Sequence, residues 1–215
     1  MKRPASYWAK SVHAYVDNKN FVMPPTPKQR AKFRQTMITG HLRKASEDTQ
    51  RGLKKPRRQR AFLGVPSVCV AAAVAKDRVI LWRVHDRPWN GQAAADTYAC
   101  PMLKALKRTW GDRKVFTIVE GGDRKGNQSK KGIDAKARVG IKALTPPPRS
   151  PSLMPLDLSI WKEIQNKVND TAPKNTESKD DFLARLRKCA QKLPKGYVQR
   201  VINRTKSNIQ GIGDA

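Results

Sequence analysis

The stretch "TPPPRSPSLMPLDLSIW", residues 145–161, joins five prolines to the start of a helix. Proline fixes φ and is tolerated at the first helical position, because the N–H there has no intrahelical partner. Pro155 is therefore expected to begin a helix with an apolar stripe of Leu156, Ile160, Ile164 and Val168. Asp157 then lies in the first turn, where the helix dipole favours a carboxylate. Taken alone, this position suits either a residue that only supports the helix start or a functional carboxylate.

The charge of the chain points to a polyanionic partner. The 215 residues include 45 Lys and Arg against 17 Asp and Glu, a formal net charge of +28. Nucleic acid is the first choice of partner and an anionic membrane surface is the second. The longest apolar run, residues 61–75, is too short to span a bilayer and contains Pro66. No secretory signal follows the basic start, because no apolar segment comes after it.

Cysteine and histidine usage indicates neither disulfides nor a metal site built on those residues. Cys69, Cys100 and Cys189 are odd in number and form no CxxC pair, which is typical of a reducing compartment. We interpret all three as buried structural thiols. The three histidines have no metal-ligand spacing among themselves or with the cysteines.

Residues 28–60 differ from the rest of the chain. They carry twelve Lys and Arg against Glu47 and Asp48, with few apolar residues. We interpret residues 28–61 as a basic, mobile or partly helical insertion that is either a solvated loop, a phosphate-binding segment or a nuclear localisation signal. The domain division that follows is a core of residues 1–175 and a helical extension of residues 176–215 packed on it.

The remaining segments predict a mixed sheet covered by helices, an α/β fold. Residues 11–22 are expected to form a strand, a turn at Asp17–Asn18 and a short return strand. A hairpin is expected over 67–84, and a helix over 90–111 that Pro101 kinks or splits. Further strands are predicted over 114–120 and 141–144, and further helices over 127–140, 176–193 and 194–211.

Acidic residues are scarce, and three groups of them fall at predicted element ends. Asp17 lies in the first strand region, "EGGD" (120–123) ends a strand, and Asp157 opens a helix. Brought together, such carboxylates could hold Mg²⁺, which takes oxygen ligands and can act on a phosphodiester. Asp17 could equally be only a turn residue, because Asp-Asn suits hairpin turns. A phosphate-binding loop at 121–128 is not supported, since Asn127 and Gln128 stand where Lys and Ser or Thr are needed.

Three of these segments together resemble Tc1/mariner transposases. Residues 147–164, "PPRSPSLMPLDLSIWKEI", resemble the family pattern S-P-D-L-N-P-[IL]-[DE]-x-x-W, with Ser152 and Met154 in place of Asp and Asn. Residues 6–21 resemble the first-strand block, and residues 119–132 resemble the D-N-D-P or D-G-D block. The resemblance covers residues 6–211. It implies an RNase H-like catalytic core of the DDE superfamily that uses Mg²⁺ or Mn²⁺ and three carboxylates for DNA cleavage and strand transfer.

Carried over by motif, the resemblance assigns Asp17 as the first catalytic and metal-binding carboxylate and Asp157 as the third. The second position is open. Gly121 aligns best with the family Asp, a shift of two nominates Asp123, and strand alternation points Glu120 away. We take Asp123 as the candidate, and we expect low or absent activity if Gly121 is a lost ligand.

The resemblance also implies DNA as the partner and the nucleus as the location, and it leaves a homodimer open. Family members carry helix-turn-helix domains before the first strand, and we expect those to be missing from this chain. A non-catalytic DNA-binding protein derived from a transposase is the alternative function, and a basic structural or RNA-binding protein is a third.

Overall fold

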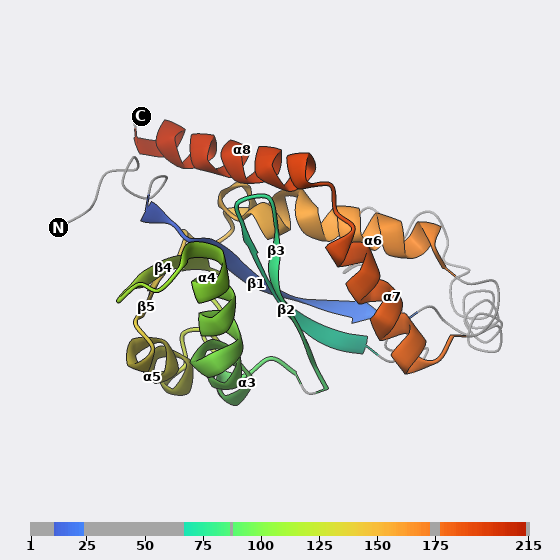
Figure 1. Ribbon diagram of the computed structural model, residues 1–215, viewed down its shortest axis with the longest axis horizontal. Coiled ribbons are helices and arrows are strands. Elements are labelled where there is room, and N and C mark those ends of the chain that lie inside the picture. Colours follow the sequence, from blue (N-terminus) through green and yellow to red (C-terminus); the bar gives the residue numbers. More distant parts are fainter. Residues whose placement is uncertain (1–10, 24–66, 87, 173–176, 214–215) are drawn as a thin grey trace, which may run out of the picture.

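The computed structural model describes residues 11–23, 67–86, 88–172 and 177–213 (Figure 1). A five-stranded sheet with the order β3-β2-β1-β4-β5 forms its centre. The strands are β1 (Ala14–Val22), β2 (Ser67–Ala75), β3 (Arg78–His85), β4 (Phe116–Glu120) and β5 (Ile141–Leu144). In the part of the chain described, no helix has the length and apolar character needed to cross a membrane.

The sheet combines an antiparallel half with a parallel half. β1 pairs antiparallel with β2 and β2 antiparallel with β3, while β1–β4 and β4–β5 are parallel. Parallel neighbours need crossover connections. Helices lie in the connection that precedes β4 in the chain and in the connection that follows it. The mixed α/β sheet expected from the sequence is confirmed.

The turn expected at Asp17–Asn18 is wrong. β1 continues through both residues, because it pairs with β2 without a break from Tyr15 to Val22. The ladder hydrogen bonds of this long register outweigh the local turn preference of Asp-Asn. The interpretation of Asp17 as a hairpin turn residue is therefore also wrong. Asp17 lies in the middle of the central strand, β1.

The hairpin expected over 67–84 is confirmed. β2 and β3 are antiparallel, and Lys76 adopts a left-handed φ of 54° in the tight connection between them. β2 is buried from Val68 to Ala75 because helices cover both faces of the sheet.

One face of the sheet is covered by helices from the middle of the chain. Pro101 lies in a π-helical turn that separates two helices, so the split expected over 90–111 is confirmed. Their core includes Val16 of β1, Ile118 of β4 and Leu106. These elements are α3 (Gly91–Thr97), η3 (Tyr98–Met102), α4 (Leu103–Trp110) and α5 (Lys130–Arg138).

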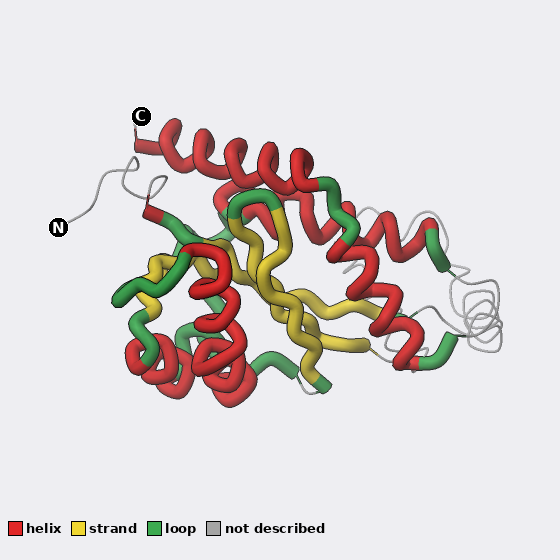
Figure 2. Tube along the Cα trace, in the orientation of Figure 1, coloured by secondary structure: helices red, strands yellow, loops and turns green. Residues whose placement is uncertain are grey.

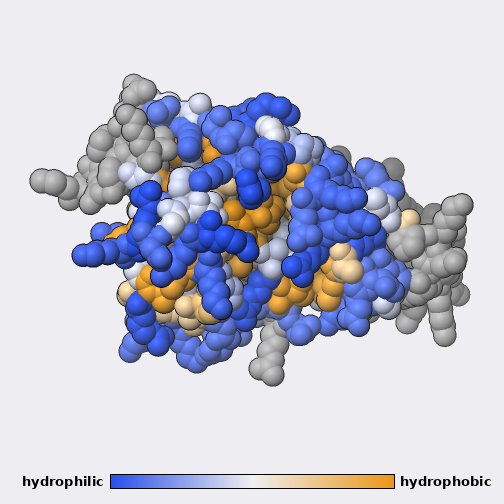
Figure 3. Space-filling view, viewed as in Figure 1, coloured by the Kyte–Doolittle hydropathy of each residue, from blue (hydrophilic) through white to orange (hydrophobic). Residues whose placement is uncertain are grey.

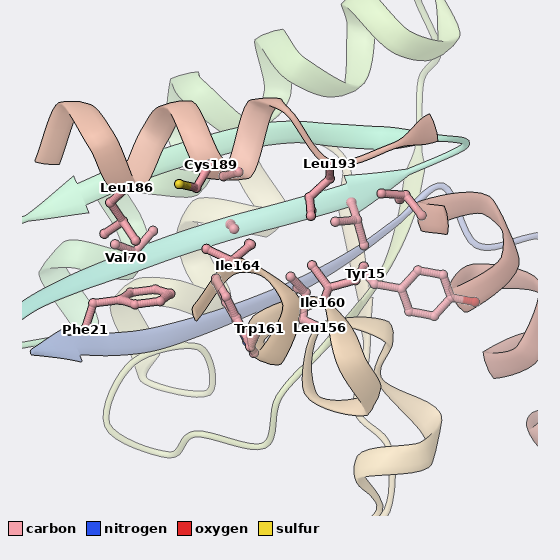
Figure 4. Close-up of a cluster of buried hydrophobic side chains, with 14 of the residues drawn as sticks. Tyr15, Phe21, Val70, Leu156, Ile160, Trp161, Ile164, Leu186, Cys189 and Leu193 are labelled. Carbon is pink, nitrogen blue, oxygen red and sulfur yellow. The ribbon is translucent and has the colours of Figure 1, made fainter. Parts of the chain in front are cut away.

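The opposite face is covered by helices that follow the proline-rich stretch (Figure 2). The expected apolar stripe is buried throughout, at Leu156, Ile160, Ile164 and Val168. Figure 4 shows three of these side chains packed against Tyr15 and Phe21 of β1. The elements are η4 (Pro151–Leu153), η5 (Leu156–Ile160), α6 (Trp161–Asp170), α7 (Lys179–Gln191) and α8 (Lys195–Gly213).

The last two helices pack into the same apolar cluster, through Phe182 and Leu186 of α7 and Val198 of α8. Ser178 caps α7, since its Oγ accepts a hydrogen bond from the N–H of Asp181 at 3.1 Å. The division of the chain at residue 175 stays a prediction.

Cys69 and Cys189 are buried as expected, but Cys100 is exposed because it lies on the outer side of the η3 turn.

Hydrophilic side chains cover most of the face in Figure 3, and hydrophobic ones are visible in the hollow between α4 and α8, over the β2–β3 hairpin. The basic segment 28–61 lies outside the described residues.

Candidate active site

Asp17 lies in the central strand and faces the α6 side of the sheet. Side chains alternate along a strand, and Tyr15 and Phe21 both belong to the core cluster on that side. Val16 belongs to the cluster on the other side. Asp17 is therefore a carboxylate placed at the inner surface of the α6 layer, beside an aromatic core.

Asp157 reaches the same place from the proline-rich stretch. It lies in the first turn of η5, with Pro155 as the residue before the turn and the N–H of Leu158 bonded to the Met154 carbonyl at 2.8 Å. Its carboxyl group lies beside that of Asp17, and the two interact through a side-chain hydrogen bond. Two residues that are 140 positions apart in the sequence thus form one acidic pair.

The environment of the pair opposes two full negative charges. Burial, followed by the neighbouring charge of Asp157, raises the pKa of Asp17 to about 7, although the Trp161 indole acts in the opposite direction. Burial also raises the pKa of Asp157, while its hydrogen bond with Asp17 and the charge of Lys19 lower it. At neutral pH the pair therefore retains a proton for part of the time, and a cation between the carboxylates would favour full ionisation.

Trp161 orients the Asp17 carboxylate. Its indole Nε1 donates a hydrogen bond to Asp17 Oδ2 at 2.7 Å. The ring is held edge-on against Phe21, with centroids 5.7 Å apart (Figure 4). It is also tilted against Trp82, with centroids 6.2 Å apart. The indole thus occupies one carboxylate oxygen, Oδ2, and does not bond to Oδ1.

Replacing Trp161 by Phe is expected to raise the pKa of Asp17 further above its usual range. The substitution keeps an aromatic ring but removes the N–H that stabilises the ionised carboxylate, an interaction of roughly 1.5–3 kcal/mol for a charged acceptor. A carbon-detected NMR titration of the aspartate carboxyl groups measures this. Trp82→Phe is the matched control, because Trp82 Nε1 is buried and has no hydrogen-bond partner among the described residues. An equal shift in both variants would contradict an orienting role for the indole.

Gly121 lies next to Asp17 on the same side of the sheet. The last residue pair between β1 and β4 is Val16 with Glu120, so residue 121 follows directly beside residue 17. A Cβ built on Gly121 would lie 3.4 Å from Asp17 Oδ1. Glu120 points to the opposite face, as alternation predicts, and is buried there with Lys136. A carboxylate at position 121 would therefore lie beside the acidic pair and make it a group of three.

Asp123 does not join the pair. Its Oδ1 accepts the N–H of Lys125 at 3.1 Å, and its carbonyl accepts the N–H of Gln128 at 2.9 Å, so it shapes its own loop. Among the described residues no three Asp, Glu, His or Cys side chains are grouped as a metal site. The catalytic and metal-binding roles assigned to Asp17, Asp123 and Asp157 stay predictions.

A groove of about 760 Å³ opens beside the pair. Residues 145–151 form one wall, and Gly121, Gly122 and Gln128 belong to the other, with Asp157 in the lining. Arg124 and Arg149 also line it, and Arg149 adopts a left-handed φ of 60°. An acidic pair at a groove that carries two arginines suits an anionic substrate that approaches a cation.

No role for Trp161 or Lys19 was predicted from the sequence. Trp161 stands four residues after Asp157, a spacing that puts both on one side of a helix, and this could have indicated a shared site. Lys19 stands two residues after Asp17 in the same strand and so shares its face.

Comparison with known proteins identifies the fold. No family model and no curated protein matches the sequence. Among solved structures, the catalytic domain of Mos1 mariner transposase matches with a TM-score of 0.63 and 11% identity, over 97% of this chain and 87% of that one. The chain has the RNase H-like fold of the mariner transposase catalytic domain. The fold class that the resemblance implied is confirmed.

Other states of the same transposase give similar matches. Its catalytic domain with raltegravir and Mn matches with a TM-score of 0.62 and 10% identity, over 98% of this chain and 88% of that one. The pre-cleavage Mos1 transpososome matches with a TM-score of 0.65 and 14% identity, over 98% of this chain and 59% of that one. The chain thus spans about three fifths of the transposase chain in that assembly.

Proposed function

We propose that this chain is a transposase catalytic domain of the mariner type, which binds DNA and holds a divalent cation between Asp17 and Asp157. The observation that carries the proposal is the adjacency of these two carboxyl groups, from β1 and η5, on the fold of that domain. A further part of the proposal is that the missing carboxylate at Gly121 leaves DNA cleavage weak or absent.

The residues fit Mg²⁺ or Mn²⁺. Both ions take oxygen ligands, and Mg²⁺ commonly binds through one or two carboxylates together with waters and substrate phosphates. Asp17 Oδ1 is not used by Trp161, and Asp157 lines the open groove. Mos1 catalytic-domain structures with Mn and with Mg support the use of a divalent cation by a domain of this fold. Such an ion, when bound, activates water and stabilises the charge of a reacting phosphodiester.

The protein side chains would place the substrate. Asp17, oriented by Trp161, and Asp157, fixed by the prolines before it, would hold the cation at one end of the groove. Arg124 and Arg149 would contact phosphates along it, since guanidinium groups bind phosphate oxygens in pairs. The net charge of +28 would add attraction for DNA that does not depend on sequence.

The test is Mn²⁺ binding measured by electron paramagnetic resonance in the presence of a DNA duplex. We expect saturable binding that Asp17→Asn and Asp157→Asn each weaken by about tenfold or more, or about 1.4 kcal/mol. Asp123→Asn is the matched control, because it removes one carboxylate from the neighbouring loop. A loss of binding in Asp123→Asn alone would move the cation to Asp123 and overturn this assignment.

A non-catalytic DNA-binding protein is the second candidate, and the absence of a carboxylate at Gly121 favours it. DNA affinity that is the same with and without Mn²⁺, and unchanged by Asp157→Asn, would support this function. A nuclear location and a homodimer are further proposals. Mos1 forms a paired-end complex, which supports the second of them.

A further inference from the structure

A buried polar cluster lies behind the end of β4, on the sheet face opposite Asp17. Its four members come from β4, η3, the loop after β4 and α5, and their exposed fractions are at most 4%. They are Glu120, Tyr98, Asn127 and Lys136. None of them reaches the groove, so the proposed chemistry leaves their burial unexplained.

The members are joined by hydrogen bonds. Lys136 Nζ donates to Glu120 Oε1 and, at 2.9 Å, to the carbonyl of Asn127. The Tyr98 hydroxyl donates to Glu120 Oε2 at 2.6 Å and lies 3.2 Å from Asn127 Oδ1. Asn127 Nδ2 in turn donates to the carbonyl of Gly121 at 3.1 Å. The cluster therefore ends on the main chain of the residue that adjoins Asp17.

Position 121 needs this support because both strand ladders end before it. The pairing of β4 with β1 ends at Glu120, and its pairing with β5 ends at Val119. Beyond these pairs no neighbouring strand fixes the main chain of residue 121. The hydrogen bond from Asn127 takes the place of a ladder bond there.

The loop that carries Asn127 is itself tightly held. The N–H of Ser129 bonds to the carbonyl of Gly126 at 3.1 Å. A Cβ on Gly126 would lie 2.1 Å from Trp89 Nε1, so the loop backbone contacts the indole without room for a side chain. Asn127 is thus a fixed donor.

Such a cluster serves placement more than stability. Burying an ammonium and a carboxylate away from water is costly, and their mutual attraction largely offsets that cost without much net gain. A fully satisfied buried network, however, holds its members in one arrangement. Glu120 and Gly121 share a peptide unit, so fixing the Glu120 side chain and the Gly121 carbonyl fixes the direction in which residue 121 faces.

We propose that Tyr98, Glu120, Asn127 and Lys136 form a positioning cluster that directs residue 121 toward Asp17 across the sheet. The inference rests on the proposed function for the meaning of that position, which is the place of a third ligand to a divalent cation. Tyr98 and Lys136 act through the main chain and touch neither cation nor DNA.

The test compares two buried tyrosines in a Gly121→Asp background. Tyr98→Phe removes a hydroxyl that belongs to the cluster. Tyr15→Phe is the matched control, because the Tyr15 hydroxyl is buried without a hydrogen-bond partner among the described residues. Mn²⁺ affinity is measured by electron paramagnetic resonance, and amide hydrogen exchange is followed at Gln128 and Ser129.

We expect Tyr98→Phe to weaken Mn²⁺ binding about tenfold, within the 10- to 100-fold range for outer residues of metal sites, and to speed exchange at both amides. Tyr15→Phe should change neither. Asn127→Ala, which keeps the Glu120–Lys136 pair, should reproduce the loss if Tyr98→Phe folds poorly. Equal Mn²⁺ affinity in the two tyrosine variants, or a lower melting temperature as the only effect of Tyr98→Phe, would overturn the inference.

The two proposals fail in different ways. If neither the unmodified chain nor Gly121→Asp binds Mn²⁺, the proposed cation site is wrong. Hydrogen exchange then still tests the positioning role of the cluster. Faster exchange at Gln128 and Ser129 in Tyr98→Phe supports that role, and unchanged exchange refutes it.

Discussion

Gly121→Asp is expected to raise Mg²⁺-dependent nicking of supercoiled plasmid by about 100-fold or more, equivalent to roughly 2.7 kcal/mol of activation free energy. The unmodified chain should show little or no nicking. A doubly charged cation beside a phosphate needs enough fixed anionic oxygen to stay in place, and the acidic pair supplies only two carboxylates. The substitution adds the third one beside Asp17.

The backbone at position 121 accepts a side chain. A Cβ there makes only ordinary van der Waals contact with Asp17 Oδ1, at 3.4 Å. Gly121 is also absent from the glycines with positive φ, which are Gly111 and Gly140 in the described chain. The new carboxylate can therefore be introduced without backbone strain.

Gly122→Asp is the matched control for this experiment. It adds the same charge one residue further on, where a Cβ would lie 3.3 Å from Thr145 Cγ2 instead of near Asp17. Gly121→Asp combined with Asp157→Ala is the blank. Equal activation by the two glycine substitutions would show that charge alone matters. Clear nicking by the unmodified chain that disappears in Asp123→Ala would make Asp123 the second ligand.

Asp17→Asn is expected to stabilise the metal-free protein at pH 8 by about 2 to 4 kcal/mol, and to have little effect near pH 4. The pKa of Asp17 is about 7 in the folded chain, above its ordinary value of 3.8. Between these values the folded state binds more protons than the unfolded state, so the free energy of unfolding falls as pH rises. The upper limit of the expected stabilisation follows from about 1.4 kcal/mol per unit of pKa difference. Sharing of the proton with Asp157 makes the expected stabilisation smaller than this limit.

Urea unfolding at pH 4, 6 and 8 measures this difference. Asp134→Asn is the control, since Asp134 is exposed on α5 and its carboxylate forms no ion pair in the described structure. Mn²⁺ should stabilise the unmodified chain more than Asp17→Asn at pH 8, because a ligand that binds only the folded state shifts the equilibrium. A difference in the free energy of unfolding between the two proteins that does not change with pH would contradict the raised pKa of Asp17.

The helix after the prolines could be predicted because its pattern is local. Pro155, Asp157 and the apolar stripe from Leu156 to Val168 all lie within a few turns, and their spacing alone indicates which side is buried. The hairpin of β2 and β3 was predictable for the same reason. The acidic pair was predicted through the family resemblance, which links positions that spacing alone does not.

The features that the sequence did not reveal depend on long-range pairing. The turn expected at Asp17–Asn18 was wrong because β2, more than forty residues away, pairs with β1 from Tyr15 to Val22. The placement of Gly121 beside Asp17, and of Asp123 in its own loop, depends on where the parallel ladders end. Tyr98 and Lys136 become neighbours of Glu120 only when η3 and α5 pack on the same face of the sheet.

The most direct test of the cation site is a crystal structure of the Gly121→Asp variant soaked in Mn²⁺, with an anomalous difference map. We expect a peak within coordination distance, about 2 Å, of the Asp17 and Asp157 carboxylates, with the new carboxylate as a further ligand. A peak at Asp123 alone, or no peak beside Asp17 and Asp157 at saturating Mn²⁺, would contradict the proposal that these two residues hold the cation.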